Sequence, residues 1–402
     1  MQTFGAFIVS LLVASSGLAL AAPAAQNGKT VTVTAKQNDK FVANGPLALA
    51  RAYAKYNKPL SAQQIALLQS AGKQKRQTGS VGADPQPSDI EYLAEVHIGT
   101  PAQKVLLDFD TGSSDLWVLT SQLNGLNGQA TYDASRSSSA KQLNGASWSI
   151  TYADQSGASG DVFNDVVSIG GLSVKKQAVE RASQVTPTFA SGAESGLVGL
   201  AWDSINTVSP KPQKTWFSNI KSSLAAPVFT SRLRHNADGS YNFGFIDKTQ
   251  FTGDITYTAV DNSNGFWAFT STGYTVGNGQ QNSQSINGIA DTGTTLLLLP
   301  DAVVNDYYSN VSGATNDQTA GGYVFDCSAQ LPDFSFGVES STITIPGSFI
   351  NFSPVNPGDN SRCFGGLQSD GGQLSIFGDV ALKAAFVVWD AGQQRLGWAT
   401  GA

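Results

Sequence analysis

Short runs of β-branched and aromatic residues recur along most of the chain, and many of them alternate apolar with polar positions. Glycine, asparagine, aspartate and serine separate these runs, which is the composition of turns between strands. The pattern is typical of an all-β protein built from many short strands. The clearest predicted strands cover residues 105–109, 148–152, 162–169, 255–260, 266–276 and 386–389.

Helical periodicity is confined to a few short segments. Residues 215–224 and 301–308 each place apolar side chains along one stripe, as a helix packed on a core does. Closer to the N-terminus, apolar residues between Leu47 and Leu68 predict two more short helices with basic faces. We therefore expect few helices, all of them short.

An apolar run opens the chain, from Phe4 to Leu20, and Ala19-Leu20-Ala21 supplies small residues at a plausible cleavage point. A membrane anchor is one interpretation, but a span needs about 20 apolar residues, and this run is shorter and interrupted by Ser-Ser-Gly. A secretory signal peptide over residues 1–21 fits the pattern better. We therefore expect a secreted, extracellular protein without a membrane anchor.

Charge divides the chain into two unlike parts. The residues up to Arg76 include nine basic residues and one acid, a net charge of +8, whereas the remainder has 15 basic and 29 acidic residues, a net −14. An acidic body repels phosphate backbones, so we expect no nucleic-acid partner. Two histidines and two cysteines cannot form a zinc finger or a three-histidine site. A carboxylate-only metal site stays open on this count, although we expect neither a metal nor a cofactor.

The basic segment ends at the dibasic pair Lys75-Arg76, and a loop-like Gln-Thr-Gly-Ser-Val-Gly follows. An ordinary exposed charge pair is the alternative interpretation. Its position, after a secretory signal and a basic leader, favours a processing site. Residues 22–76 are therefore predicted to be a propeptide that is removed at this pair.

An internal repeat organises the rest of the chain. The sequence Asp-Phe-Asp-Thr-Gly-Ser-Ser around Asp110 returns as Gly-Ile-Ala-Asp-Thr-Gly-Thr-Thr around Asp291, and an apolar stretch follows each copy. Two apolar residues before a glycine then occur in both halves, with Gly199 and Gly378 lying 89 and 87 residues after their aspartates. Two matched events at nearly equal offsets indicate a duplicated pair of lobes, which we place at residues 77–255 and 256–402.

The repeated Asp-Thr-Gly carries the candidate chemistry. A single copy is most often a turn, but two copies after apolar strands, related by a two-fold axis, would bring Asp110 and Asp291 face to face. Two carboxylates at hydrogen-bonding distance cannot both be ionised, so the pair holds one proton. One carboxylate can then act as a base on water while the other acts as an acid toward a carbonyl oxygen, the division of roles known from the aspartic-protease dyad.

From about Glu91 to its end, the chain resembles the pepsin family of aspartic endopeptidases, in detail the secreted fungal enzymes of the penicillopepsin and aspergillopepsin type. The motifs that carry the resemblance lie at residues 109–117, 149–154, 196–202, 241–247, 288–296 and 377–380. The resemblance implies a bilobal pepsin-like fold, with two pseudo-twofold-related β lobes, a deep cleft and a few short helices. It also implies a monomeric, pepstatin-sensitive enzyme that cleaves proteins at acidic pH, prefers large hydrophobic residues around the scissile bond, and is made as a zymogen.

The same resemblance assigns roles to individual residues. Asp110 and Asp291 would hold the nucleophilic water. The residues that would support the two active loops are Thr111, Gly112, Ser113, Thr292, Gly293 and Thr294. Within the first lobe, residues 148–160 would form a flap, with Tyr152 over the cleft and its hydroxyl paired with the indole N–H of Trp117. Asp154 at the flap tip points to acceptance of lysine before the scissile bond, and a solvated turn residue is the alternative.

In the leader, Lys55-Tyr56 resembles the family element in which a lysine pairs with both aspartates and keeps the zymogen inactive. A lysine on an ordinary helix face is the alternative. The leader would then act as an intramolecular inhibitor. We expect a pH-sensitive lock, in which the attraction between the basic leader and the acidic body fades as the pH falls toward carboxylate pKa values near 4.

Two covalent features complete the prediction. Cys327 and Cys363 lie 36 residues apart in a chain expected to be secreted, so we expect one disulfide in the second lobe. Asn310-Val-Ser and Asn351-Phe-Ser are glycosylation sequons, and the proline after the second makes it the weaker one.

Three other functions fit the sequence less well than proteolysis. A pepsin-like protein that binds without cleaving would typically lack one catalytic residue, and both motifs are whole here. A glycosidase also uses two carboxylates but holds them about 5–9.5 Å apart, and the repeated Asp-Thr-Gly argues against it. A serine hydrolase is disfavoured because the chain contains no Gly-x-Ser-x-Gly.

Overall fold

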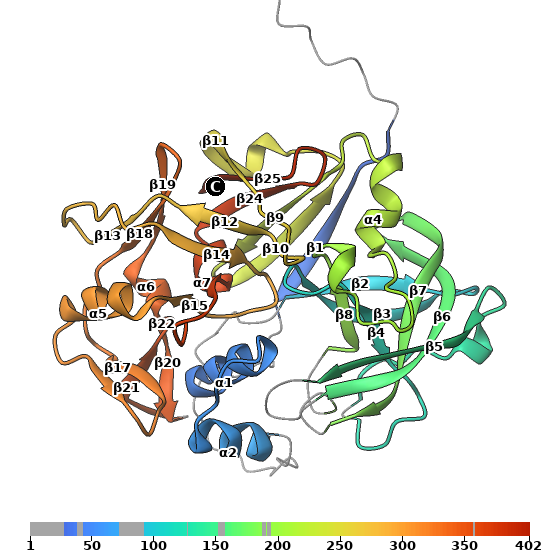
Figure 1. The fold of residues 1–402 in the computed structure, drawn as a ribbon, viewed down its shortest axis with the longest axis horizontal. Coiled ribbons are helices and arrows are strands. Elements are labelled where there is room, and N and C mark those ends of the chain that lie inside the picture. The colour runs from blue at the N-terminus through green and yellow to red at the C-terminus, as the bar shows by residue number, and fades with distance from the viewer. Residues whose placement is uncertain are drawn as a thin grey trace, which may run out of the picture.

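The computed structural model describes residues 28–37, 43–71, 92–126, 128–151, 157–186, 190, 194–356 and 358–402. Two groups of strands make up most of the molecule, and two helices of the leader lie between them (Figure 1). No helix in these ranges combines the length and the apolar character that crossing a bilayer requires.

The first part of the chain contributes ten strands to the described structure: β1 (Val31–Gln37), β2 (Tyr92–Ile98), β3 (Gln103–Asp110), β4 (Leu116–Leu119), β5 (Lys141–Thr151), β6 (Gly157–Ile169), β7 (Leu172–Val185), β8 (Gly196–Gly199), β9 (Val228–Arg234) and β10 (Ala237–Phe243). The second part contributes β11 (Phe251–Ala259), β12 (Ala268–Ser271), β13 (Tyr274–Val276), β14 (Ile286–Ala290), β15 (Leu297–Leu299), β16 (Thr315–Asp317), β17 (Gly322–Asp326), β18 (Phe334–Val338), β19 (Ser341–Ile345), β20 (Asn351–Asn356), β21 (Asp359–Gly365), β22 (Leu367–Ser369), β23 (Ser375–Phe377), β24 (Ala385–Asp390) and β25 (Arg395–Gly401).

Helices are short throughout the described ranges. They are α1 (Gly45–Lys55), α2 (Ala62–Ala71), α4 (Trp216–Ile220), α5 (Asp301–Ser309), α6 (Gly347–Ile350) and α7 (Asp379–Leu382). Single 3₁₀ turns add Ala134–Arg136, Asp203–Ile205, Lys221–Ser223 and Lys248–Gln250. The predicted all-β class with a few short helices is confirmed.

One large sheet connects the two parts of the chain. Its strand order is β11-β25-β24-β9-β10-β1-β2-β3-β8-β4-β7-β6-β5. The last two strands, β24 and β25, return to pair with β9 and β11, so the end of the chain lies beside its middle (Figure 1). Strand β11 runs through the boundary expected at residues 255 and 256, because it pairs along its length with β25.

The internal repeat appears as a repeated strand arrangement. In the first copy, β8 pairs parallel with β3 and antiparallel with β4. In the second copy, β23 pairs in the same way with β14 and β15. Gly199 and Gly378 thus occupy equivalent places, at the end of β8 and just after β23. The matched offsets in the sequence reflect two copies of one supersecondary unit, each delivering one aspartate.

The predicted elements agree with the structure except in one segment. The helices expected near residues 215–224 and 301–308 correspond to α4, with its 3₁₀ extension, and to α5. The single strand expected at 266–276 is wrong, because two strands, β12 and β13, occupy that segment. The chain breaks at Gly273, whose φ of +143° lies outside the extended range of a strand.

A strand in the leader went unpredicted. Residues 31–37 form β1, which inserts between β10 and β2 of the large sheet. Val33 and Ala35 point into the core and are 6% and 0% exposed. The alternation Val-Thr-Val-Thr-Ala-Lys was the available signal.

Aromatic side chains from both parts of the chain build the centre of the core. The rings of Phe229 and Trp389 stack with centroids 5.4 Å apart, and Trp267 packs edge-on against both. All three side chains are buried. This cluster joins strands far apart in the sequence and sets the two halves against each other.

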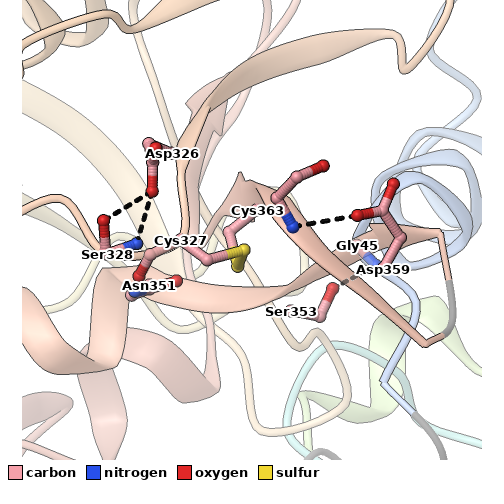
Figure 2. The surroundings of a disulfide bond; sticks show 9 residues. Gly45, Asp326, Cys327, Ser328, Asn351, Ser353, Asp359 and Cys363 are labelled. Carbon is pink, nitrogen blue, oxygen red and sulfur yellow. Dashed lines mark hydrogen bonds between the residues drawn. A yellow bond between two sulfur atoms is a disulfide. The ribbon is translucent and has the colours of Figure 1, made fainter.

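The predicted disulfide is confirmed. Cys327 follows β17 and is bonded to Cys363 in β21, with their Cα atoms 4.8 Å apart (Figure 2). Nearby, Asn351 Nδ2 donates to the Cys327 carbonyl oxygen at 2.8 Å. The first residue of leader helix α1, Gly45, donates its N–H to Ser353 Oγ at 3.0 Å beside this bridge (Figure 2).

Candidate active site

Asp110 and Asp291 lie at the ends of equivalent strands and converge on one point. Asp110 is the last residue of β3, and Asp291 directly follows β14. Their side chains are 1% and 0% exposed. Both carboxylates contact the ammonium of Lys55, whose Nζ is 2.9 Å from Asp110 Oδ1 and 3.1 Å from Asp291 Oδ2. The fold therefore brings together two acids that are 181 residues apart in the sequence.

Each carboxylate is held by its own loop in the same way. A backbone N–H two residues later donates to one oxygen, and a hydroxyl three residues later donates to the other. The donors are Gly112 N (2.7 Å) and Ser113 Oγ (2.7 Å) for Asp110, and Gly293 N (2.9 Å) and Thr294 Oγ1 for Asp291. These four bonds fix both side chains and favour their charged forms.

The glycines of the two motifs are required by close approach across the site. A Cβ placed on Gly112 would lie 2.5 Å from Asp291 Oδ1, and one placed on Gly293 would lie 2.3 Å from Asp110 Oδ1. Each loop therefore touches the carboxylate of the other half. Any larger residue at either position would push the two acids apart.

Thr111 and Thr292 connect the two loops beneath the carboxylates. Thr111 N donates to Thr292 Oγ1 at 3.1 Å, and Thr292 N donates to Thr111 Oγ1 at 3.0 Å. Each hydroxyl also donates across the interface, from Thr111 to the Ala290 carbonyl at 3.2 Å and from Thr292 to the Phe109 carbonyl at 2.5 Å. This reciprocal arrangement is buried and holds the loops at a constant separation.

The leader covers the acid pair with two consecutive side chains. Besides its contacts with both carboxylates, Lys55 Nζ donates to the Gly293 carbonyl at 3.2 Å. The Tyr56 hydroxyl donates to Asp291 Oδ2 at 2.6 Å. Burial opposes the charged form of Lys55, but the two carboxylates outweigh it and raise its pKa well above the usual value.

The two aspartates have different pKa values while Lys55 is present. Burial raises the pKa of Asp110 to about 6, against the lowering effect of Lys55 and together with repulsion from Asp291. Burial also favours neutral Asp291, but Lys55 and the hydrogen bonds from Thr294 and Tyr56 outweigh it and lower the pKa of Asp291 to about 2. The pair can therefore hold a single proton across a wide pH range.

An apolar surface next to the acids lies under leader helix α1. Leu49 and Ala52 of the helix form one buried cluster with residues of the second half. That half contributes Ile289, Leu296, Leu298, Val324, Phe364 and Ile376, among others. Because Ile289 lies two residues before Asp291, this surface borders the acid pair directly.

The expected flap is described only in part. Strands β5 and β6 form an antiparallel hairpin in which Trp148 pairs with Gly160. Trp148 packs against Trp117 with ring centroids 6.0 Å apart. Tyr152 and Asp154, at the expected tip, lie outside the described residues, as do the expected signal peptide and the expected processing pair Lys75-Arg76.

The two sequons differ in their surroundings. Asn310 ends α5 and is exposed, with Nδ2 donating to the Asp306 carbonyl at 2.9 Å. Asn351 is half-buried, and its Nδ2 is bonded to the Cys327 carbonyl beside the disulfide.

Sequence reasoning missed a second pair of buried acids behind the Asp110 loop. Asp115 and Glu180 are 2% and 1% exposed, and both accept from the same nitrogen, Asn206 Nδ2, at 2.8 Å. That nitrogen also donates to the Ser114 carbonyl at 3.2 Å. Burial and the Asp115 charge raise the pKa of Glu180 well above its usual value. No sequence pattern links residues 115 and 180, so only the fold reveals this pair.

Metal chemistry has no obvious centre in the described part of the chain, where no group of three His, Cys, Asp or Glu side chains is arranged to hold an ion.

Comparison with known proteins places this site in a family. A family model described as eukaryotic aspartyl protease matches residues 91–401. The chain is 53% identical to endothiapepsin of Cryphonectria parasitica over 372 residues, covering 90% of this chain and 88% of that protein. It is 48% identical to aspergillopepsin-1 of Aspergillus pseudoglaucus over 396 residues, covering 97% and 98%. Penicillopepsin-1 of Penicillium rubens is 50% identical over 375 residues, covering 92% and 90%.

The matched region contains both Asp-Thr-Gly loops and the threonine contacts between them. The chain therefore belongs to the eukaryotic aspartyl protease family and is an aspartic endopeptidase of the pepsin type.

Proposed function

We propose that this chain is a secreted zymogen whose mature, monomeric form cleaves proteins at acidic pH with a water molecule held between Asp110 and Asp291. The observation that carries the proposal is the position of Lys55 Nζ, which is hydrogen-bonded to both carboxylates. A water molecule is about as large as the ammonium group of Lys55, so it can occupy the position of Nζ between the two carboxylates once the leader leaves.

The reaction follows from one proton shared between two acids. The ionised carboxylate takes a proton from the water as its oxygen attacks the peptide carbonyl carbon. The protonated carboxylate gives its proton to the carbonyl oxygen, which produces a neutral tetrahedral diol. The carboxyl that received the water proton then passes it to the amide nitrogen. As the C–N bond breaks, a hydroxyl of the diol gives its proton to the other carboxylate, so the products are a carboxylic acid and an amine and the pair is back in its one-proton state. The backbone and hydroxyl donors around each acid support this cycle by keeping both carboxylates in place.

The leader acts as an intramolecular inhibitor in this proposal. Lys55 and Tyr56 occupy the water position and one face of Asp291, so no substrate can reach the acids. Residues 1–21 act as the signal peptide and residues 22–76 as the propeptide, with Lys75-Arg76 as the processing pair. The two catalytic lobes follow as residues 77–255 and 256–402.

Substrate preference follows from the surface that the leader covers. Removal of α1 exposes apolar residues such as Ile289 and Ile376 beside the acids, which suits large hydrophobic side chains around the scissile bond. Acceptance of lysine before the scissile bond would depend on Asp154 at the flap tip. Cleavage of lysine peptides by Asp154→Ser, compared with the unaltered enzyme, tests this role, and an unchanged lysine preference removes it.

Of the two sequons, we propose Asn310 as the glycosylated one. Its side chain is exposed at the end of a helix, whereas Asn351 Nδ2 is engaged with the Cys327 carbonyl. Mass analysis of secreted Asn310→Gln and Asn351→Gln proteins tests this. Loss of the glycan only in the second variant would reverse the assignment.

Digestion of a denatured protein at acidic pH, with and without pepstatin, tests the central proposal. We expect complete inhibition by pepstatin and a loss of kcat on the order of 10⁴-fold in Asp291→Asn. Asp254→Asn, an exposed aspartate in β11, is the matched control and should keep full activity. Pepstatin-insensitive proteolysis, or none from a processed chain, contradicts the proposal.

A further inference from the structure

Lys58 has a buried ammonium that the inhibitory role of Lys55 does not explain. Its side chain is 1% exposed, and Nζ donates to the carbonyl oxygens of Asp370 at 2.6 Å and Leu374 at 2.8 Å. Burial lowers the pKa of Lys58, and the negative charge of Asp370 acts in the opposite direction. A buried ammonium is unfavourable unless its donors are satisfied, so residues 369–374, the cation turn, must supply compensating contacts.

The cation turn is held in shape by contacts that do not involve the leader. Asp370 is 2% exposed, and its carboxylate accepts from Gly372 N at 2.8 Å and from Ser375 Oγ at 2.7 Å. Its own N–H donates to the Leu299 carbonyl at 2.8 Å. These partners all belong to the second half of the chain, so we expect Asp370 and its carbonyl oxygen to keep their position when the leader is removed.

The cation turn binds a part of the leader that is near, along the chain, to the part that covers the acid pair. Lys58 follows Lys55 by three residues, and three residues span at most about 10 Å between Cα atoms. On the preceding helical turn, the Tyr53 hydroxyl donates to the Ser369 carbonyl at 3.0 Å. Leu374 also packs against the apolar cluster that contains Leu49 and Ile289. A peptide bound across the acids can therefore reach the turn within a few residues.

We propose that the cation turn is a specificity-determining subsite for a lysine side chain of the substrate, and that Lys58 occupies it until the leader leaves. The proposal rests on the endopeptidase function proposed above. Two convergent carbonyl oxygens with a carboxylate nearby suit the compact ammonium of lysine, whereas the planar guanidinium of arginine pairs best with a coplanar carboxylate edge. This subsite is separate from the lysine preference assigned to Asp154, because the turn belongs to the other half of the molecule.

Paired peptide substrates test the subsite on the activated enzyme. Each pair carries lysine or norleucine at one position, scanned from the second to the fourth residue on each side of the scissile bond. We expect kcat/KM to be about 5- to 10-fold higher for lysine at one of these positions, because charge-assisted hydrogen bonds form there. In Asp370→Asn the lysine-to-norleucine ratio should fall toward 1, since the charge is lost while the side chain keeps its shape.

Asp359→Asn is the matched control, because it removes a carboxylate from the exposed start of β21 in the same half, where Asp359 accepts from Ser361 N at 3.0 Å. It should leave the ratio unchanged. A ratio near 1 at every position in the unaltered enzyme overturns the proposal, whether or not Asp370→Asn folds, and so does a lysine preference that survives Asp370→Asn. Pepstatin-sensitive cleavage of the norleucine peptides reports the endopeptidase function separately, and its absence identifies failure of that function.

Discussion

At the scale of single residues, the site depends on small groups that serve both halves of the molecule. The hydroxyl of Thr111 accepts from Thr292 N and donates to the Ala290 carbonyl, so one oxygen atom satisfies two groups of the opposite half. Valine has the same shape as threonine but neither hydrogen bond. The loss of stability on replacing Thr111 with valine therefore measures the contribution of these two hydrogen bonds between the loops.

We expect Thr111→Val to lower the free energy of unfolding by about 1–3 kcal/mol, because it leaves a buried N–H and a buried carbonyl without partners. Urea denaturation at acidic pH measures the loss, and kcat should fall as well because the loop spacing relaxes. Thr252→Val, at an exposed position of β11, is the control and should change little. Equal stability of both variants would contradict the role of the contact.

The acid pair behind the Asp110 loop gives a pH prediction. Burial and the Asp115 charge raise the pKa of Glu180 in the folded protein. At pH values between the usual glutamate pKa near 4.3 and this raised pKa, the folded protein therefore keeps a proton that the unfolded chain has lost. The contribution of Glu180 to stability is therefore present below about pH 4 and is lost as the pH rises. Burial and the neighbouring Asp115 charge make the ionised form of Glu180 unfavourable in the folded protein.

Glu180→Gln should flatten the decline of unfolding free energy with rising pH by up to about 1.4 kcal/mol per pH unit, the contribution of one proton. Denaturation curves collected from pH 3 to 7 measure this slope. Glu95→Gln is the control, since Glu95 is exposed and Lys104 lowers its pKa. Parallel slopes for the wild type and Glu180→Gln would rule out this carboxyl as a source of the decline.

At the scale of elements, short strands are stabilised by what joins them. Strands β16, β17, β21 and β20 of the second half form a sheet of their own, which shares none of the described strands with the large sheet. The Cys327–Cys363 bond ties the end of β17 to β21 within it. Leader helix α1 begins against β20, where Gly45 contacts Ser353.

Replacing both Cys327 and Cys363 with alanine should lower the free energy of unfolding by about 3–4 kcal/mol, the chain-entropy estimate for a loop of this length. Thermal unfolding of the mature protein measures the effect. Reduction of the wild-type protein should produce the same loss, and a double variant as stable as the oxidised wild type would contradict the estimate.

At the scale of the whole molecule, the basic leader and the acidic body are two parts of one charge pattern. The opposite charges of +8 and −14 meet most directly at Lys55, between the two aspartates. Asp291 has a lowered pKa in the presence of the leader, so its contribution to leader binding is present above its usual pKa near 4 and is lost as the pH falls toward 2. Burial raises the pKa of Asp110 to about 6, but the charge of Lys55 lowers it, so the attraction between Lys55 and Asp110 also weakens as Asp110 takes up a proton on acidification.

Leader release from purified zymogen should therefore accelerate as the pH falls below about 4. In Lys55→Met, release should be faster on the order of 100-fold at pH 5, because breaking a buried pair leaves two carboxylates uncompensated. Arg51→Met removes an exposed charge from the same helix and is the control. A release rate that does not change with pH would refute the lock.

The sequence by itself determined the class and the chemistry of this protein, because both are written in local patterns. Alternating apolar positions indicated strands, the duplicated Asp-Thr-Gly indicated two lobes, and the cysteine pair indicated the disulfide that is present. Elements with a strong period, such as α5, were predicted within a residue or two. The predicted strand at 266–276 was wrong, because the chain leaves the extended conformation at Gly273, where φ is +143°.

Only the tertiary structure decided which distant groups share a buried space. Asp115 and Glu180 meet at one amide nitrogen, and Lys58 ends on the carbonyl oxygens of a turn more than 300 residues away. Such contacts leave no local period or motif, because they arise where separate strands and turns are packed against each other. The pKa shifts and the proposed lysine subsite depend on that packing, since burial and proximity, and not residue type alone, set the cost of a charge.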